Sequence, residues 1–139
     1  MPELKKYKMF INGEWVNSDT EKIFETLNPE NNKPWAVVPE ASASDVDRAV
    51  KAAQNAFEGE WPKLLPKERA RYLRMIGDKL RENAEHLGKI ETIDTGKLYR
   101  ETYKQANYIA EYYDYYAGLA DKVEGTVLPI DKPNIQAIT

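Results

Sequence analysis

Short apolar runs alternate with turn-forming residues in the first forty residues, a pattern that predicts β-strands. Residues 9–16 are centred on Asn12-Gly13, a dipeptide that tolerates positive φ at both central positions of a tight turn, so a β-hairpin is expected. Two further strands are expected at residues 23–27 and 35–38. The segment between them is dense in asparagine and proline, which favours a turn.

From residue 42 the apolar spacing changes from that of a strand to that of a helix. Ser44 is expected to be the N-cap, accepting a hydrogen bond from the Asp47 amide. Gly59 and Pro62 are expected to end this first helix. The apolar residues of the helix fall at helical spacing and form one stripe: Val46, Ala49, Val50, Ala53 and Phe57.

A second helix is expected over residues 66–94, since proline is tolerated in a first helical turn. Gly77 and Gly88 weaken it, so a break near Asn83 is expected. Gly96 is expected to stop the helix. Its predicted buried face consists of Leu73, Ile76, Leu80, Leu87 and Ile90.

A third helix is expected over residues 99–120, followed by strands at 126–128 and 135–138. It carries two adjacent apolar faces, which are Tyr108, Tyr112, Tyr115 and Leu119, and Ile109, Tyr113, Tyr116 and Ala120. The tyrosines could form an aromatic wall for a small ligand, or the helix could be buried on two sides. Their wide arc favours the second interpretation, because they could not all meet one ligand.

The composition describes one ordinary globular domain. The chain has 139 residues, of which 42% are hydrophobic and 31% charged. A net charge of −3 gives no general attraction to nucleic acid or anionic lipid, and the basic stretch at 63–74 is interpreted as a solvated helix face. No apolar run approaches the roughly 18 residues of a membrane span, and the N-terminus does not resemble a secretory signal. We therefore expect a cytoplasmic protein without nucleic-acid or membrane partners.

The residues for several kinds of chemistry are missing. There is no cysteine, and His86 is the one histidine. A thiolate nucleophile, a hydrolase triad and a multi-histidine metal site are therefore excluded. His86 is expected to be exposed. The seven glycines are too scattered to form a dinucleotide fingerprint or a P-loop.

Two carboxylates, Glu91 and Asp94, lie one turn apart near the expected helix end at Gly96. Together with backbone carbonyls they could hold a hard cation. A helix C-terminus is unfavourable for negative charge, so compensation by a basic side chain is expected, and Lys97 is the simplest candidate.

Six strings along the chain resemble the aldehyde dehydrogenase superfamily in order and spacing. Each is weak alone, but the six in sequence are specific, and the resemblance extends from about residue 7 to residue 139. The strings are Phe-Ile-Asn-Gly-Glu-Trp at 10–15, Asn-Pro at 28–29, Ser-Asp-Val-Asp-Arg-Ala-Val-Lys-Ala-Ala at 44–53, Pro-Lys-Glu-Arg-Ala at 66–70, Glu-Thr-Ile-Asp-Thr-Gly-Lys at 91–97 and Tyr-Tyr-Ala-Gly-Leu-Ala-Asp-Lys at 115–122. The chain departs from the usual family pattern at Asn31-Asn32 and at Leu98, both in expected turns.

The resemblance implies a longer parent enzyme of the α/β class, of which this chain would be the N-terminal fragment. The fragment itself is expected to be mainly helical. Residues 1–123 would be the first part of the coenzyme-binding domain, with a β-hairpin arm and three helices. Residues 124–139 would begin a truncated oligomerisation hairpin. The implied partners are the remainder of the dehydrogenase chain and further copies of the parent, in a homo-oligomer (dimer or tetramer).

The resemblance also implies the parent's chemistry. It would oxidise an aldehyde to a carboxylic acid with NAD or NADP, through a cysteine thiohemiacetal and thioester. The cysteine, the water-activating glutamate and the coenzyme-binding glycines of the family would all lie downstream of Thr139. The fragment alone is therefore expected to be inactive and to bind no coenzyme.

Two sets of site residues carry over from the resemblance. A structural Na⁺ or K⁺ would take the backbone carbonyls of Thr26 and Leu27 and the carboxylate of Asp94 as ligands. The positions that line the aldehyde tunnel in the family fall at Lys104, Asn107 and Tyr108.

Two other functions stay open from the sequence. One is a stand-alone helical interaction domain derived from the family, against which the end of the chain within an expected strand argues. The other is a small-ligand binder that uses the tyrosine-rich helix.

Overall fold

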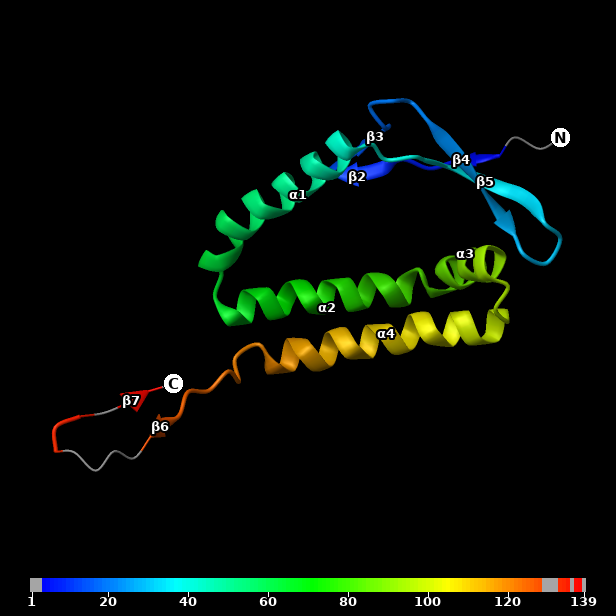
Figure 1. Ribbon diagram of the computed structural model, residues 1–139. Coiled ribbons are helices and arrows are strands. Elements are labelled where there is room, and N and C mark those ends of the chain that lie inside the picture. The colour runs from blue at the N-terminus through cyan, green and yellow to red at the C-terminus, as the bar shows by residue number, and fades with distance from the viewer. Residues whose placement is uncertain (1–3, 129–132, 136, 139) are drawn as a thin grey trace.

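The computed structural model describes residues 4–128, 133–135 and 137–138 of the chain. In those residues it contains four α-helices and three small sheets. The N-terminal strands lie at one end, an antiparallel pair of long helices forms the middle, and a short hairpin extends from the far end (Figure 1). No helix within the described ranges is long and apolar enough to span a membrane.

The N-terminal hairpin forms as the sequence predicts. Strand β2 (Met9–Ile11) pairs with β3 (Glu14–Val16), with Phe10 opposite Trp15. The turn between them has φ of 54° at Asn12 and 83° at Gly13. Positive φ at both positions gives the turn the right-handed twist that two strands joined this closely require.

The next two strands, β4 (Ile23–Asn28) and β5 (Lys33–Pro39), are also confirmed, with slightly wider bounds. They pair antiparallel, and β1 (Lys5–Lys6) joins β5 in parallel, giving the order β1-β5-β4. Asn32 adopts a φ of 53° in the turn, a conformation that asparagine tolerates better than most residues. The register shifts between Thr26 and Leu27.

Helix α1 (Ala43–Glu58) begins earlier than predicted. Its N-cap is Ser42 and the prediction of Ser44 is wrong. The Ser42 hydroxyl accepts from the Asp45 amide at 3.1 Å, while the Asp45 carboxylate accepts from the Ser42 amide at 2.8 Å. This reciprocal capping box satisfies two backbone donors at once, which a cap at Ser44 would not do.

The predicted long second helix is broken at Asn83, as expected, so four α-helices replace three. Helix α2 (Pro66–Glu82) follows a short 3₁₀ turn, η1 (Trp61–Lys63), and α3 (Ala84–Thr95) follows the break. Gly96 ends α3 with a φ of 76°. Helix α4 (Tyr99–Leu119) then runs back along α2 and α3 (Figure 1).

The most deeply buried residues between α2–α3 and α4 are small, and the predicted buried face is wrong for Ile76 and Leu87, while Leu73, Leu80 and Ile90 are half-buried. Ile76 and Leu87 remain 43% and 38% exposed. A Cβ added to Gly88 would lie 2.9 Å from the backbone nitrogen of Tyr103, so the helices approach too closely for large side chains. The buried residues here are Ala70, Gly77, Ala84 and Gly88 from α2–α3, and Thr102, Ala106, Ala110 and Ala117 from α4.

The apolar stripe of α1 is present but is not covered by the described residues. Val46, Val50 and Phe57 are each more than half exposed. The last two strands, β6 (Val127–Leu128) and β7 (Ala137–Ile138), pair antiparallel as the C-terminal hairpin. The other predicted strand residues, Thr126 and Ile135, lie outside these strands, and Gln136 lies outside the described residues.

We predict that Gly88→Ala destabilises the chain by about 1–3 kcal/mol, because the new methyl group forces the Tyr103 backbone away. Gly118→Ala is the matched control, since nothing lies within 4 Å of its added Cβ. There the gain in helix propensity should stabilise the chain by up to about 1 kcal/mol. Urea unfolding followed by circular dichroism measures both. A Gly88→Ala midpoint at or above that of the unmodified chain would contradict the close-packing account.

Candidate functional site

Asp94 lies where the end of α3 meets the β4–β5 hairpin. Its Oδ1 accepts from the Thr26 hydroxyl at 2.6 Å and from the Trp35 indole nitrogen at 3.3 Å. Two of the three residues predicted as cation ligands, Thr26 and Asp94, are thus brought together from positions 68 residues apart, through the Thr26 hydroxyl rather than the carbonyl predicted as the ligand. Leu27 follows Thr26 at the register shift of β4. Trp35 was not predicted, because no local pattern pairs an indole with a carboxylate so distant in sequence.

The neighbouring carboxylate, Glu91, is neutralised by Lys97. The Lys97 ammonium lies 2.6 Å from Glu91 Oε1, across the turn at Gly96. The expected compensation of negative charge at the end of α3 is therefore confirmed. The turn itself is tightly placed, since an added Cβ on Gly96 would lie 3.0 Å from Pro29 Cγ.

This junction offers oxygen ligands but few charged ones. The described part of the chain contains no group of three or more histidine, cysteine, aspartate or glutamate residues that could hold a metal ion. The last turn of a helix also presents carbonyl oxygens that lack helical partners and carry partial negative charge. A monovalent cation held by Asp94 and backbone carbonyls is the kind of ion that such a junction could accept.

The tyrosine-rich face of α4 is open, so the described residues cover only one side of this helix. The exposed fractions of Tyr108, Tyr112, Tyr115 and Tyr116 are 55%, 48%, 63% and 57%. With Glu111, they line a hollow of about 430 Å³. The hydroxyls of Tyr108 and Tyr112 lie 3.0 Å apart, and this hydrogen bond raises the pKa of Tyr112.

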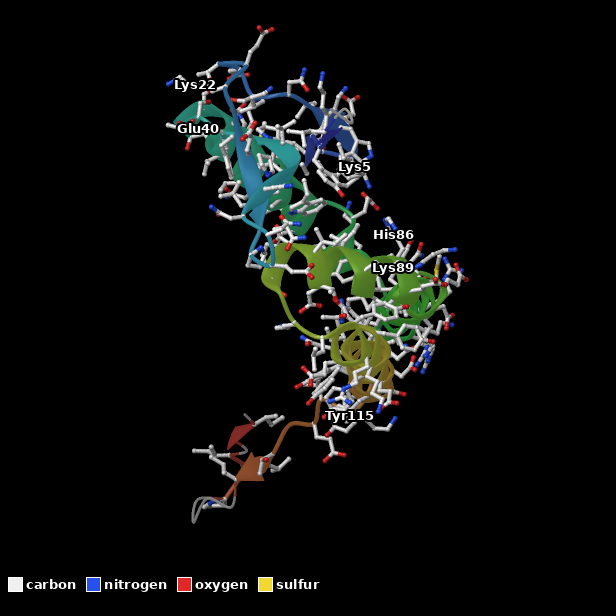
Figure 2. The ribbon with its side chains drawn as sticks, turned by 90° about the vertical axis from the view of Figure 1, so that its right-hand side faces the viewer. Lys5, Lys22, Glu40, His86, Lys89 and Tyr115 are labelled. Atoms are coloured by element: carbon white, nitrogen blue, oxygen red, sulfur yellow. The ribbon has the colours of Figure 1, made fainter. Side chains whose placement is uncertain are left out.

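The predicted tunnel residues Lys104, Asn107 and Tyr108 lie within about one turn of α4. The Asn107 side-chain amide donates to the Tyr103 carbonyl at 3.0 Å. Lys104 and Tyr108 are exposed. His86 is also exposed, on α3, as predicted (Figure 2).

Asp45 ties the N-terminal segment to α1. Its carboxylate accepts from the Ser18 hydroxyl at 2.7 Å and from Arg48 at 2.5 Å, and Arg48 also reaches Asp19 at 2.9 Å. Asp45 is 1% exposed. The hydrogen bond from the Ser42 amide, followed by that from Ser18, lowers the pKa of Asp45 well below its ordinary value. The sequence does not reveal this site, since Ser18 lies in a loop.

A sequence model described as the aldehyde dehydrogenase family matches residues 15–139. The chain belongs to the aldehyde dehydrogenase family. Among its curated relatives, a (Z)-2-((N-methylformamido)methylene)-5-hydroxybutyrolactone dehydrogenase of Acinetobacter baylyi is 42% identical over 96% of this chain and 27% of that protein. Aldehyde dehydrogenase family 2 member C4 of Arabidopsis thaliana is 37% identical over 100% of this chain and 28% of that protein.

Solved aldehyde dehydrogenase structures share the fold. Betaine aldehyde dehydrogenase of Staphylococcus aureus, in complex with NAD⁺, superposes with a TM-score of 0.85 and 38% identity over 91% of this chain and 25% of that one. An NAD-dependent aldehyde dehydrogenase of Sinorhizobium meliloti superposes with a TM-score of 0.90 and 28% identity, over 98% of this chain and 28% of that one. The chain thus spans about a quarter of the length of these relatives, and its mainly helical fold with small sheets corresponds to part of theirs.

The described glycines do not form a phosphate cradle of the dinucleotide-binding kind. A pyrophosphate needs clustered glycines whose amides converge before a helix. Here Gly77, Gly88 and Gly118 lie inside helices, and Gly13 and Gly96 lie in separate turns. The chain also has no cysteine. This part of the aldehyde dehydrogenase fold therefore supplies neither a phosphate cradle in its described residues nor a thiol nucleophile.

We predict that Asp45→Asn lowers the stability of the chain at pH 7 and flattens its acid dependence. A carboxyl with a lowered pKa in the folded state stabilises above its unfolded pKa, about 3.9, and this stability is lost as the pH falls through the folded pKa. Asp47→Asn is the control, because Asp47 is exposed on the same helix. Thermal unfolding at pH 7, 4 and 2 measures the effect, because this stability is lost below the unfolded pKa. Equal pH profiles for Asp45→Asn and the unmodified chain would refute the assignment.

Proposed function

We propose that this chain is the N-terminal part of an NAD(P)-dependent aldehyde dehydrogenase that oxidises an aldehyde to a carboxylic acid. The observation that carries the proposal is the family match over residues 15–139. The chain spans about a quarter of the length of its relatives, and it has no cysteine. The S. aureus relative is in complex with NAD⁺, which supports a nicotinamide coenzyme for the whole enzyme.

The reaction would proceed through a cysteine thiohemiacetal and a thioester, with water activated by a glutamate. Those groups would come from sequence outside these 139 residues. We therefore propose that the chain contributes structure rather than reacting groups, and that it is inactive alone.

The exposed apolar faces support this structural role. A hollow of about 490 Å³ on α2–α3 is lined by apolar side chains with few polar neighbours, chiefly Tyr72, Met75, Ile76, Leu80 and Leu87. The stripe of α1 is open as well. Contiguous exposed apolar surface is unusual for a chain that has no further packing partner, and helices of this kind would cover one face of a coenzyme-binding sheet.

A stand-alone helical interaction domain is the second candidate, since the same apolar faces could dock another protein. The intact mass of the native protein distinguishes the two, because a dehydrogenase would be several times heavier than this chain. Cytoplasmic location and a dimeric or tetrameric parent stay predictions from the sequence and the resemblance. The assignment of Lys104, Asn107 and Tyr108 to the aldehyde path is likewise a proposal. Their shared segment on α4 supports it.

We predict that the purified 139-residue chain forms no NADH from propanal and NAD⁺, because it has no nucleophile for the covalent step. Titration with NAD⁺ should likewise give no saturable change in tryptophan fluorescence at micromolar concentrations. A full-length family member measured in parallel is the positive control. Saturable micromolar binding of NAD⁺ by the chain would contradict the proposal that the coenzyme-binding residues lie outside it.

We also propose that the carbonyls of Thr26 and Leu27 and the carboxylate of Asp94 hold a monovalent cation. The proximity of Thr26 and Asp94 supports this site.

We predict that Na⁺ or K⁺ stabilises the chain relative to choline at equal ionic strength. At a concentration ten times its Kd, a bound ion would contribute about 1.4 kcal/mol. Asp94→Asn should abolish the difference between the salts, and Asp47→Asn should retain it. Thermal unfolding in NaCl, KCl and choline chloride measures these differences in stability. Equal stability of the unmodified chain in all three would rule the site out.

A further inference from the structure

A third hollow, of about 170 Å³, lies where α2 begins beside the end of α4 (Figure 1). Sites for drug-sized molecules are larger, roughly 300–1,000 Å³, so this hollow suits a small group. It shares no residue with the proposed cation and aldehyde positions. We call it the basic hollow, and its lining consists of Pro66, Lys67, Ala70 and Arg74 from α2, and Ala117, Gly118, Ala120, Asp121 and Lys122 from α4 and the turn after it.

Small residues form the floor of the basic hollow. Ala70 and Ala117 are buried in the contact between α2 and α4. Nothing lies within 4 Å of a Cβ added to Gly118, so the space beside this glycine is open. A floor that belongs to a packed helix contact needs little ordering when a ligand binds.

The lining carries an excess of positive charge. Lys67, Arg74 and Lys122 contribute three cations, and Asp121 contributes the one carboxylate. The Lys122 ammonium lies 2.5 Å from Asp121 Oδ1. This hydrogen bond and the charge of Lys122 lower the pKa of Asp121, with a smaller contribution from Arg74. Asp121 therefore offsets one of the three positive charges, and two remain.

The acidic residues of α2 near this end do not offset the remaining two charges. The Glu68 carboxylate accepts from a backbone amide at the start of the helix at 2.8 Å, and Asp78 pairs with Arg81 at 3.3 Å. Among the described residues, neither the Lys67 ammonium nor the Arg74 guanidinium makes an ion pair or a side-chain hydrogen bond. Both groups are thus available to a ligand.

The charge and the donor types favour a phosphate group. The start of α2 and the end of α4 contribute partial charges of opposite sign, so the side chains determine the sign of the field in the hollow. A guanidinium can donate two parallel hydrogen bonds to a phosphate, and an ammonium adds a compact charge. A phosphate monoester carries a charge close to −2 at neutral pH, which matches the excess of two.

We propose that the basic hollow binds a phosphate dianion, either free or as the end of a phosphate ester, between the Arg74 guanidinium and the Lys67 ammonium and against the open backbone at Gly118. Arg74 and Lys67 lie two turns apart on one face of α2, about 10 Å along its axis. Their long side chains both line the hollow. The site is independent of the proposed dehydrogenase reaction, because none of its residues is assigned a part in that reaction.

The test is an NMR titration of the ¹⁵N-labelled 139-residue chain with inorganic phosphate at pH 7.5 and, separately, with acetate at the same ionic strength. Phosphate should shift the amide signals of residues 67–74 and 117–122 saturably, and acetate should not. Absence of saturable shifts with phosphate would overturn the proposal, as would equal binding of acetate. Methyl phosphate distinguishes the two sources of the ligand, since equal binding supports an ester and weaker binding supports free phosphate.

Charge variants test the two named cations. Arg74→Gln and Lys67→Gln should each weaken phosphate binding about tenfold, the effect of losing a charge-assisted hydrogen bond. Lys33→Gln removes the same charge from the start of β5, outside the basic hollow, and is the matched control. Equal weakening by all three variants would show diffuse charge attraction and overturn the site.

Gly118→Leu tests the hollow without changing its charge. The larger side chain should fill the open space and abolish phosphate binding, while the urea midpoint stays the same or rises, because nothing lies within 4 Å of the added Cβ. Undiminished phosphate binding by a folded Gly118→Leu chain would place the anion outside the hollow and overturn the proposal.

Discussion

The helical part of the chain depends on a close approach of two backbones, that of α3 at Gly88 and that of α4 at Tyr103. The Gly88 carbonyl accepts from the buried Thr102 hydroxyl at 2.9 Å, and the missing side chain of Gly88 makes room for the Tyr103 backbone. Gly77 lies near the Ala110 carbonyl in a similar way. Glycines that weaken an isolated helix thus stabilise the pair, because tertiary contact outweighs a loss of about 1 kcal/mol in helix propensity.

This close contact determines where the large apolar residues lie. Because alanine, glycine and threonine occupy the interface, Ile76 and Leu87 lie outside it and remain open. The tyrosines of α4 are open for the same reason, since only the small-residue face of that helix is covered by α2 and α3. Aldehyde dehydrogenases share this fold in chains about four times as long. The open faces therefore support a role in packing against further structure rather than in chemistry.

Two aspartates connect the N-terminal strands to the helices. Asp45 binds Ser18 in the loop after β3, and Asp94 binds Thr26 of β4 and Trp35 of β5. Each carboxylate accepts from more than one donor, and the buried charge of Asp45 is stabilised by hydrogen bonds together with its ion pair to Arg48. The Asp94 contacts also form the proposed cation junction, so that site rests on side chains that support the fold.

The sequence by itself determined the local features and the family. The turn at Asn12-Gly13, the break at Asn83 and the stop at Gly96 follow from backbone preferences that act within a few residues. Only the tertiary structure decided which helix faces are buried, that Ser42 rather than Ser44 caps α1, and that Trp35 joins Thr26 at Asp94. Apolar periodicity shows that a helix face favours burial, but it does not show which neighbouring element covers that face. A contact between small residues depends on the distance between two helices, and no local sequence pattern contains that distance.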